Sequence, residues 1–138
     1  MTNKQQRMIF INLPVKDLKA SMAFYQALGF DNNPQYTDNT AACMVWSDSI
    51  HVMLLTQDKW RSFTSKPIAD SNCSEVMLAL TCNSQIEVDT MLGRVANKGG
   101  TTDVMPPRDL GFMYSRSLSD ADGHIWELFW MNPAAQCG

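Results

Sequence analysis

The sequence predicts an α+β fold built from two consecutive βαβββ repeats. The same order of strand and helix signals occurs twice along the 138 residues. Each repeat contains a predicted helix that ends at a glycine, Gly29 in the first repeat and Gly99 in the second. The closing hairpins also align, with residues 49–54 matching residues 123–128. A chain of this length is typical of one domain, so we interpret residues 1–138 as a single domain that contains both repeats.

The first repeat covers about residues 8–56. Residues that favour β-structure predict a strand over Met8–Val15, and Asp17 then occupies the N-cap position of a helix that ends at Gly29. The apolar residues of this helix recur at helical spacing: Leu18, Phe24, Tyr25 and Leu28. Three further strands are predicted over Phe30–Thr37, Thr40–Trp46 and Ile50–Thr56. Short turns between these strands complete the first βαβββ unit.

The second repeat covers about residues 75–132 and follows a polar connector over residues 57–74. Ser84 and Glu87 have the spacing of a capping box, which predicts the start of a helix that ends near Gly99. Strands are predicted on either side of this helix, over Val76–Cys82, Thr101–Val104, Phe112–Leu118 and Ile125–Met131. The second repeat therefore has the same order of elements as the first.

Composition excludes several classes of protein. With 45% hydrophobic and 18% charged residues, the chain is expected to fold rather than to remain disordered. The 11 basic residues are scattered and the net charge is −3, which argues against nucleic-acid binding. The longest apolar run, Ala41–Trp46, is too short to cross a bilayer, and no apolar signal segment follows the polar start of the chain. We expect a cytoplasmic protein that binds neither nucleic acid nor a membrane.

The closing strand of the second repeat carries an unusual carboxylate. Glu127 lies between two apolar residues and aligns with Met53 of the first repeat. Burial of a charged, unpaired carboxylate costs several kcal/mol, so Glu127 should be protonated or have a partner. Arg116 and His51 are the candidate partners. Glu127 and His51 are also the candidate catalytic residues, because a carboxylate or an imidazole can act as a general base.

Two motifs frame the predicted fold. The first is LPVKDL at residues 13–18, followed by Phe24-Tyr25 and Leu28-Gly29-Phe30, and the second is DADGHIWEL at residues 120–128. Together they resemble the vicinal oxygen chelate superfamily, which includes glyoxalase I, bleomycin-resistance proteins and extradiol dioxygenases. The likeness extends from about Met8 to Pro133. It implies the half-barrel fold of this superfamily, in which βαβββ units surround a cup, and it implies a homodimer.

The resemblance also implies where a metal would bind. Enzymes of the superfamily hold a divalent metal at four strand positions, which correspond here to Phe10, Met53, Met77 and Glu127. Phenylalanine has no donor atom, and methionine sulfur suits Cu(I) rather than Mg²⁺, Mn²⁺, Fe²⁺, Ni²⁺ or Zn²⁺. We therefore expect no metal cofactor. The alternative is a divalent metal in a displaced site, for which Glu127 and His51 are the candidate ligands.

The apolar residues at these positions predict a pocket with an apolar floor. Methionine and phenylalanine side chains favour a hydrophobic or aromatic small molecule as the ligand. The candidate ligand-binding residues are Phe10, Asn12, Met53, Met77, Tyr114, Arg116 and Phe129. Among them, Arg116 has the guanidinium donors that could orient an anionic group of the ligand.

Three functions are compatible with these residues. The first is a metal-independent binding protein of the bleomycin-resistance kind, in which Glu127 helps to orient an apolar ligand. The second is a glyoxalase-like lyase or isomerase, or a dioxygenase, that uses a displaced metal or uses Glu127 as a general base. The third is a non-catalytic interaction module whose cup is filled by side chains. The apolar residues at the metal positions favour the first function, with a small molecule and a second copy of the chain as partners.

Overall fold

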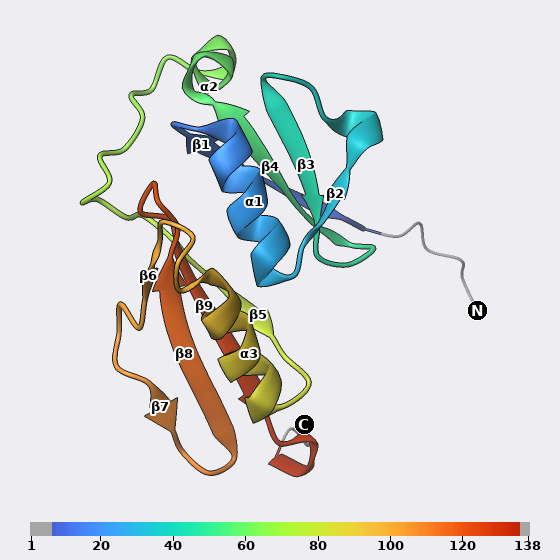
Figure 1. Ribbon diagram of the computed structural model, residues 1–138, viewed down its shortest axis with the longest axis vertical. Coiled ribbons are helices and arrows are strands. Elements are labelled where there is room, and N and C mark those ends of the chain that lie inside the picture. Colours follow the sequence, from blue (N-terminus) through green and yellow to red (C-terminus); the bar gives the residue numbers. More distant parts are fainter. Residues whose placement is uncertain (1–6, 136–138) are drawn as a thin grey trace. The chain divides into compact units, whose positions relative to one another are not determined.

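The computed structural model describes residues 7–135 and consists of two compact units, Met1–Ile68 and Ala69–Gly138 (Figure 1). Each unit contains one mixed sheet and a helix that packs on a face of that sheet. The predicted α+β class with two βαβββ modules is confirmed. The boundary between the units lies after Ile68, within the segment predicted as a connector.

Unit 1 has the predicted order of a strand, a helix and three strands. Its elements are β1 (Ile9–Val15), α1 (Leu18–Leu28), β2 (Asp31–Asn33), a 3₁₀ turn (Pro34–Tyr36), β3 (Ala41–Val45), β4 (Ile50–Thr56) and α2 (Gln57–Phe63). The strands lie in the order β1-β4-β3-β2. β1 is parallel to β4, whereas the other neighbours are antiparallel.

Two elements of unit 1 differ from the prediction. The strand expected over Phe30–Thr37 is limited to β2, because Asn33 caps a 3₁₀ turn that begins at Pro34. The polar connector contains the short helix α2, which begins where the Thr56 hydroxyl accepts a hydrogen bond from the Lys59 N–H at 3.2 Å. α2 packs against β1 and β4. A helix of this length has too few turns to show a clear apolar periodicity in the sequence.

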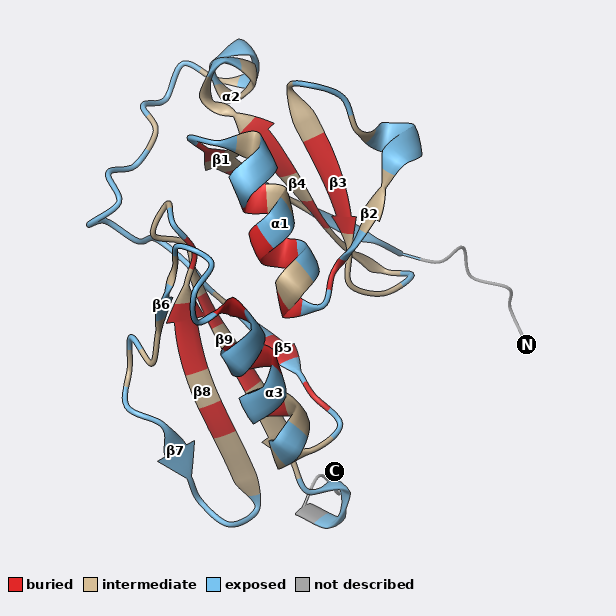
Figure 2. Ribbon diagram, viewed as in Figure 1, coloured by how far each residue is buried: buried red, intermediate tan, exposed pale blue. Residues whose placement is uncertain are grey.

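The core of unit 1 lies between α1 and one face of the sheet. The Asp17 carboxylate caps α1 by accepting from the Ala20 N–H at 3.0 Å, as predicted. Figure 2 shows the buried residues concentrated on α1 and on the strands beneath it. These residues are Phe24, Tyr25 and Leu28 of the helix and Ala42, Met44, Val52 and Leu54 of β3 and β4. Side chains alternate along a strand, so His51 and Met53 point to the opposite face.

Unit 2 repeats this arrangement with an interrupted second strand. Its elements are β5 (Met77–Thr81), α3 (Gln85–Val95), β6 (Thr101–Thr102), β7 (Arg108–Asp109), β8 (Met113–Ser119), β9 (Ile125–Met131) and a 3₁₀ turn (Pro133–Ala135). The strands lie in the order β5-β9-β8-β6, and β7 also pairs with β8. The strand predicted over Thr101–Val104 is shorter than expected, and β7 forms in the segment predicted as a loop. Pro106 and Pro107 lie between β6 and β7 and lack the N–H groups that a continuous strand would use.

The helix of unit 2 begins at the predicted cap. The Ser84 hydroxyl accepts from the Glu87 N–H at 3.0 Å, and the Glu87 carboxylate accepts from the Asn83 N–H at 3.1 Å. The buried residues of α3 and of the strands it covers are Val88, Met91, Leu92, Val95, Leu118, Trp126 and Leu128. Among the described residues, no helix has both the length and the apolar character needed to span a lipid bilayer.

Candidate functional site

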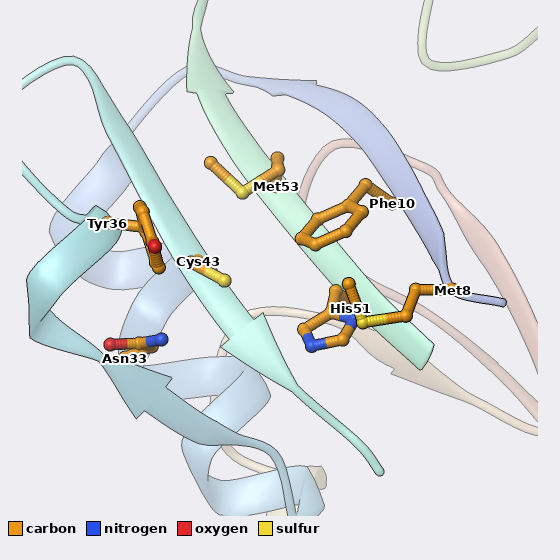
Figure 3. Close-up of a pocket in the computed structure, with 7 residues that line it drawn as sticks. All are labelled: Met8, Phe10, Asn33, Tyr36, Cys43, His51 and Met53. Atoms are coloured by element: carbon orange, nitrogen blue, oxygen red, sulfur yellow. The ribbon is translucent and has the colours of Figure 1, made fainter. Parts of the chain in front are cut away.

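A pocket of about 470 Å³ opens on the face of the unit 1 sheet that α1 does not cover. Figure 3 shows the seven residues that line it: Met8, Phe10, Asn33, Tyr36, Cys43, His51 and Met53. Three of them were predicted as site residues, namely Phe10, His51 and Met53. The alternation of strand side chains had placed His51 and Met53 on one face of their strand, and the structure has them there.

Strand pairing brings these side chains together. In the parallel pair of β1 and β4, Phe10 lies opposite His51, and their rings stack with centroids 4.3 Å apart and an angle of 14° between the planes. In the antiparallel pair of β3 and β4, Cys43 lies opposite Met53. The pocket wall therefore consists of a stacked pair of rings next to two sulfur-containing side chains.

His51 carries a buried ring nitrogen. Its Nδ1 atom is inaccessible to solvent and has no hydrogen-bond partner among the described residues. The stacked Phe10 ring covers one face of the imidazole without offering it a hydrogen bond. His51 and Phe10 therefore form a stacked pair of rings in the pocket wall.

Four lining residues were not predicted: Met8, Asn33, Tyr36 and Cys43. The 3₁₀ turn after β2 carries Tyr36 to the pocket, and Asn33 caps that turn. A strand continuing to Thr37 would have directed the Tyr36 side chain differently, so Pro34 was the signal available in the sequence for that residue. Cys43 lies in a continuous apolar run whose pattern does not show which side chains face the pocket.

Cys43 forms part of the pocket floor. Only 1% of the residue is exposed, and burial raises the pKa of its thiol. A raised pKa keeps the thiol protonated at neutral pH, which makes it a poor nucleophile. Cys43 therefore contributes apolar surface to the pocket rather than a reactive group.

Other predicted residues lie outside this pocket. Asn12 is exposed on β1, and its Nδ2 atom donates to the Phe10 carbonyl oxygen at 3.5 Å. In unit 2, Met77 belongs to the edge strand β5 and is 59% exposed. Glu127 and Phe129 are half-buried on one face of β9. The pairing of β9 places Glu127 opposite Ala79 and Ser117.

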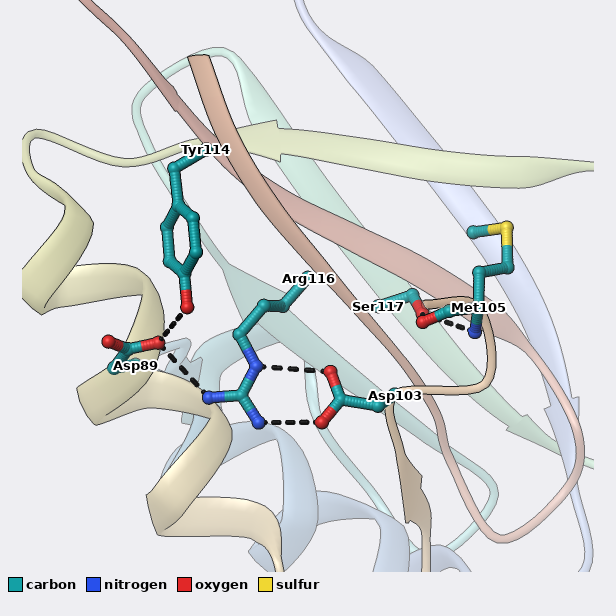
Figure 4. A network of polar contacts seen from close by, with 6 residues as sticks. All are labelled: Asp89, Asp103, Met105, Tyr114, Arg116 and Ser117. Atoms are coloured by element: carbon teal, nitrogen blue, oxygen red, sulfur yellow. Dashed lines mark hydrogen bonds and ion pairs between the residues drawn. The ribbon is translucent and has the colours of Figure 1, made fainter. Parts of the chain in front are cut away.

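Tyr114 and Arg116 lie on the other face of β8. Ser117 is the residue of β8 opposite Glu127, so the side chain of its neighbour Arg116 points to the reverse side of the sheet. The expected pairing of Arg116 with Glu127 was therefore wrong. Figure 4 shows that Arg116 instead binds two aspartates, with both Asp103 carboxylate oxygens at 3.0 and 2.7 Å and Asp89 at 3.0 Å.

In this network the positive charge of Arg116 faces the negative charges of Asp89 and Asp103. The hydrogen bond from Arg116 lowers the pKa of Asp103, and the bond that the Tyr114 hydroxyl donates to Asp89 at 2.6 Å raises the pKa of Tyr114. Arg116 thereby joins α3, β8 and the segment after β6. With its donors directed at carboxylates, Arg116 holds these elements together, and the structure gives it a structural role.

The residues at the implied metal positions do not fit a hard divalent metal. Phe10, Met53 and Met77 supply no nitrogen or oxygen donor, and Glu127 supplies one carboxylate. Within residues 7–135, no three histidine, cysteine, aspartate or glutamate side chains lie together as a metal-binding group.

Known proteins resemble this chain in sequence and in fold. The family model described as bleomycin resistance protein-like N-terminal matches residues 7–47. A hypothetical protein from S. aureus is 31% identical, with a TM-score of 0.74 over 93% of this chain and 95% of that one. No curated protein sequence matches the chain.

More distant structures share the fold. A glyoxalase-related enzyme from Fulvimarina pelagi is 20% identical, with a TM-score of 0.75 over 91% of this chain and 88% of that one. A fosfomycin resistance protein from Mesorhizobium loti is 18% identical, with a TM-score of 0.65 over 99% of this chain and 98% of that one.

Proposed function

The chain belongs to the vicinal oxygen chelate superfamily, and from this membership we propose that it binds a small organic molecule in the pocket of unit 1 without a metal ion. The pocket carries the proposal. Its volume of about 470 Å³ falls within the range of about 300–1,000 Å³ that is typical of small-molecule sites. Its lining is mostly aromatic and sulfur-containing, as expected of a site for an apolar or aromatic ligand.

The lining explains how such a ligand would be held. An aromatic ring of the ligand can pack against the ring of Phe10, which already stacks on His51, and each favourable ring contact contributes about 0.5–1.5 kcal/mol. The flexible side chains of Met8 and Met53 can adjust to the outline of the ligand. Phe10 is 45% exposed in the free protein, so a ligand would cover apolar surface that now faces water.

The interaction module and the metal-dependent enzyme have less support. An interaction module with a filled cup would have side chains where unit 1 has an open pocket. A metal-dependent lyase, isomerase or dioxygenase would need hard donor atoms that Phe10, Met53 and Met77 lack.

Binding of aromatic compounds in the presence of EDTA tests the proposal. We expect small aromatic molecules to raise the melting temperature, because a ligand that binds only the folded state stabilises it by about 2.7 kcal/mol at 100 times its Kd. Phe10→Ala should weaken binding about fivefold to tenfold, since it removes a ring contact and apolar surface.

Ile86→Ala serves as the control, because Ile86 is 77% exposed on α3 and belongs to the other unit. Its affinity should equal that of the wild type. Two results would overturn the proposal: loss of binding on addition of EDTA, or unchanged affinity in both Phe10→Ala and Met53→Ala.

We also propose that the protein is a cytoplasmic homodimer. The strands β1 and β5 each form an edge of a sheet and carry exposed apolar residues, among them Ile9 at 54% and Met77 at 59%. Exposed apolar edges are candidate surfaces for association between copies. Light scattering of the purified protein tests this proposal, and a mass of 15.5 kDa at every concentration would contradict it.

A further inference from the structure

The orientation of the Asn33 carboxamide is fixed by the backbone of the turn that follows it. Its Oδ1 atom accepts a hydrogen bond from the Gln35 N–H at 3.1 Å, which caps the 3₁₀ turn. A backbone N–H can only donate, so the side-chain atom facing it must be the oxygen rather than the nitrogen. The Asn33 carbonyl also accepts from the Thr37 hydroxyl at 2.7 Å, which holds the same segment in place.

The amide nitrogen of Asn33 is therefore available to a ligand. Figure 3 shows it directed into the pocket, on the side of His51. The Nδ2 atom carries two N–H donors and makes no hydrogen bond to another residue within 7–135. Asn33 is half-buried, and an unpaired donor there favours a ligand that places a hydrogen-bond acceptor next to it.

The pocket has no charged partner for a charged ligand. Its seven lining residues include no lysine, arginine, aspartate or glutamate. Moving an ionic group out of water without an opposite charge is costly, whereas an uncharged acceptor needs only a hydrogen-bond donor. His51 is the one lining residue that could neutralise a carboxylate, and its ring is already stacked on Phe10, so the lining favours an uncharged ligand.

From these observations we infer that the ligand is an uncharged, planar aromatic molecule with a hydrogen-bond acceptor on one edge. This inference rests on the proposed function. The rings of the ligand pack against Phe10 and His51, and its acceptor receives a hydrogen bond from Asn33 Nδ2. Asn33 is thus the residue that determines specificity, and the aromatic wall supplies most of the apolar contact.

Three two-ring probes of similar size test the inference at pH 7.5: naphthalene, which has no acceptor; quinoline, which has an uncharged ring nitrogen; and 2-naphthoate, which is an anion. We expect quinoline to bind the wild-type protein at least fivefold more tightly than either of the others. Isothermal titration calorimetry measures the three affinities. Equal binding of quinoline and naphthalene, or binding of 2-naphthoate as tight as that of quinoline, would overturn the inference.

The variant Asn33→Asp isolates the donor. Aspartate has the same shape and keeps the oxygen that accepts from the Gln35 N–H, but it has no N–H group to offer the ligand. We expect the preference for quinoline over naphthalene to disappear while naphthalene binding stays within twofold of wild type. A preference that persists in Asn33→Asp would show that another group is the donor.

Gln35→Glu is the control for the added charge, because residue 35 is exposed next to the pocket but does not line it. It should keep the wild-type preference for quinoline. Absence of binding for all three probes would contradict the proposed function and the inference together, whereas binding without discrimination contradicts the inference alone.

Discussion

At the scale of single residues, Arg116 shows how one side chain can hold an unusual backbone conformation. Asp103 has a φ of 55°, in the left-handed region that residues with a side chain seldom adopt. The Arg116 guanidinium binds both oxygens of its carboxylate at 3.0 and 2.7 Å. A paired, two-point interaction of this kind is among the stronger hydrogen-bond geometries. The pairing also lowers the pKa of Asp103. The stability that this contact contributes therefore depends on pH.

The variant Asp103→Asn should make the protein less sensitive to acid. The pKa of Asp103 is lower in the folded chain than its unfolded value of about 3.9, so the charged carboxylate stabilises the fold above that value. This contribution is lost as the pH falls through the folded pKa. Urea unfolding at pH 7, 5 and 3 should therefore show a larger loss of stability in the wild type than in Asp103→Asn.

Asparagine suits this test because it tolerates a positive φ, so the backbone conformation is retained. The variant is expected to be less stable than wild type at pH 7, since the ion pair is gone. Parallel curves of stability against pH for the two proteins would show that Asp103 does not contribute to acid sensitivity.

At the scale of elements, the turn between β8 and β9 is tied to the start of unit 2. The Asp120 carboxylate accepts from the N–H groups of Asp122 and His124 at 3.0 and 2.9 Å. Gly123 has a φ of 91°, and a Cβ atom at this position would lie 2.5 Å from the carbonyl oxygen of Ser71. The close approach of two backbone segments therefore requires glycine at this turn.

Gly123→Ala should destabilise the protein by about 2 kcal/mol or more, because it combines a positive φ with a backbone clash. Gly93→Ala is the matched control. Gly93 lies within α3 with no atom within 4 Å of an added Cβ, so this change should stabilise the helix by about 0.5–1 kcal/mol. Thermal unfolding of both variants measures the two effects. Equal stability of the two variants would refute the close approach at Ser71.

At the scale of the whole molecule, each unit has its own sheet, helix and core, and each unit contains a buried cysteine. Cys43 is 1% exposed in unit 1 and Cys82 is 8% exposed in unit 2. Burial raises the pKa of Cys82 to about 12, so its thiol is protonated under ordinary conditions. Cys73 is exposed. Cys137, the fourth cysteine of the sequence, lies outside the described residues.

Native thiol reactivity reports on both units at once. In a Cys137→Ser variant at pH 8, we expect Ellman's reagent to modify Cys73 rapidly and to reach Cys43 and Cys82 only after unfolding in guanidinium chloride. Mass spectrometry of the modified peptides identifies the sites. Rapid modification of Cys82 in the native protein would mean that the core of unit 2 opens readily.

Much of this architecture could be predicted because it depends on neighbouring residues. Asp17 and Ser84 cap their helices through bonds that span three residues. His51 and Met53 share a face because strand side chains alternate, whatever the strand is paired with. The short β2 and the extra helix α2 were missed, since Pro34 stopped one strand early and α2 lacks a clear apolar stripe.

The faces of β1 and β4, the helix caps and the repeated order of elements therefore follow from local patterns in the chain. The site as a whole depends on pairing between distant segments. Alternation grouped Tyr114 with Arg116, but the register that places Ser117 opposite Glu127 put both on the face away from that carboxylate. Likewise, Cys43 reaches the pocket through the pairing of β3 with β4, and Asn33, which lies opposite Cys43, reaches it through the pairing of β2 with β3. Contacts of this kind join residues far apart in the chain, so no short-range pattern specifies them.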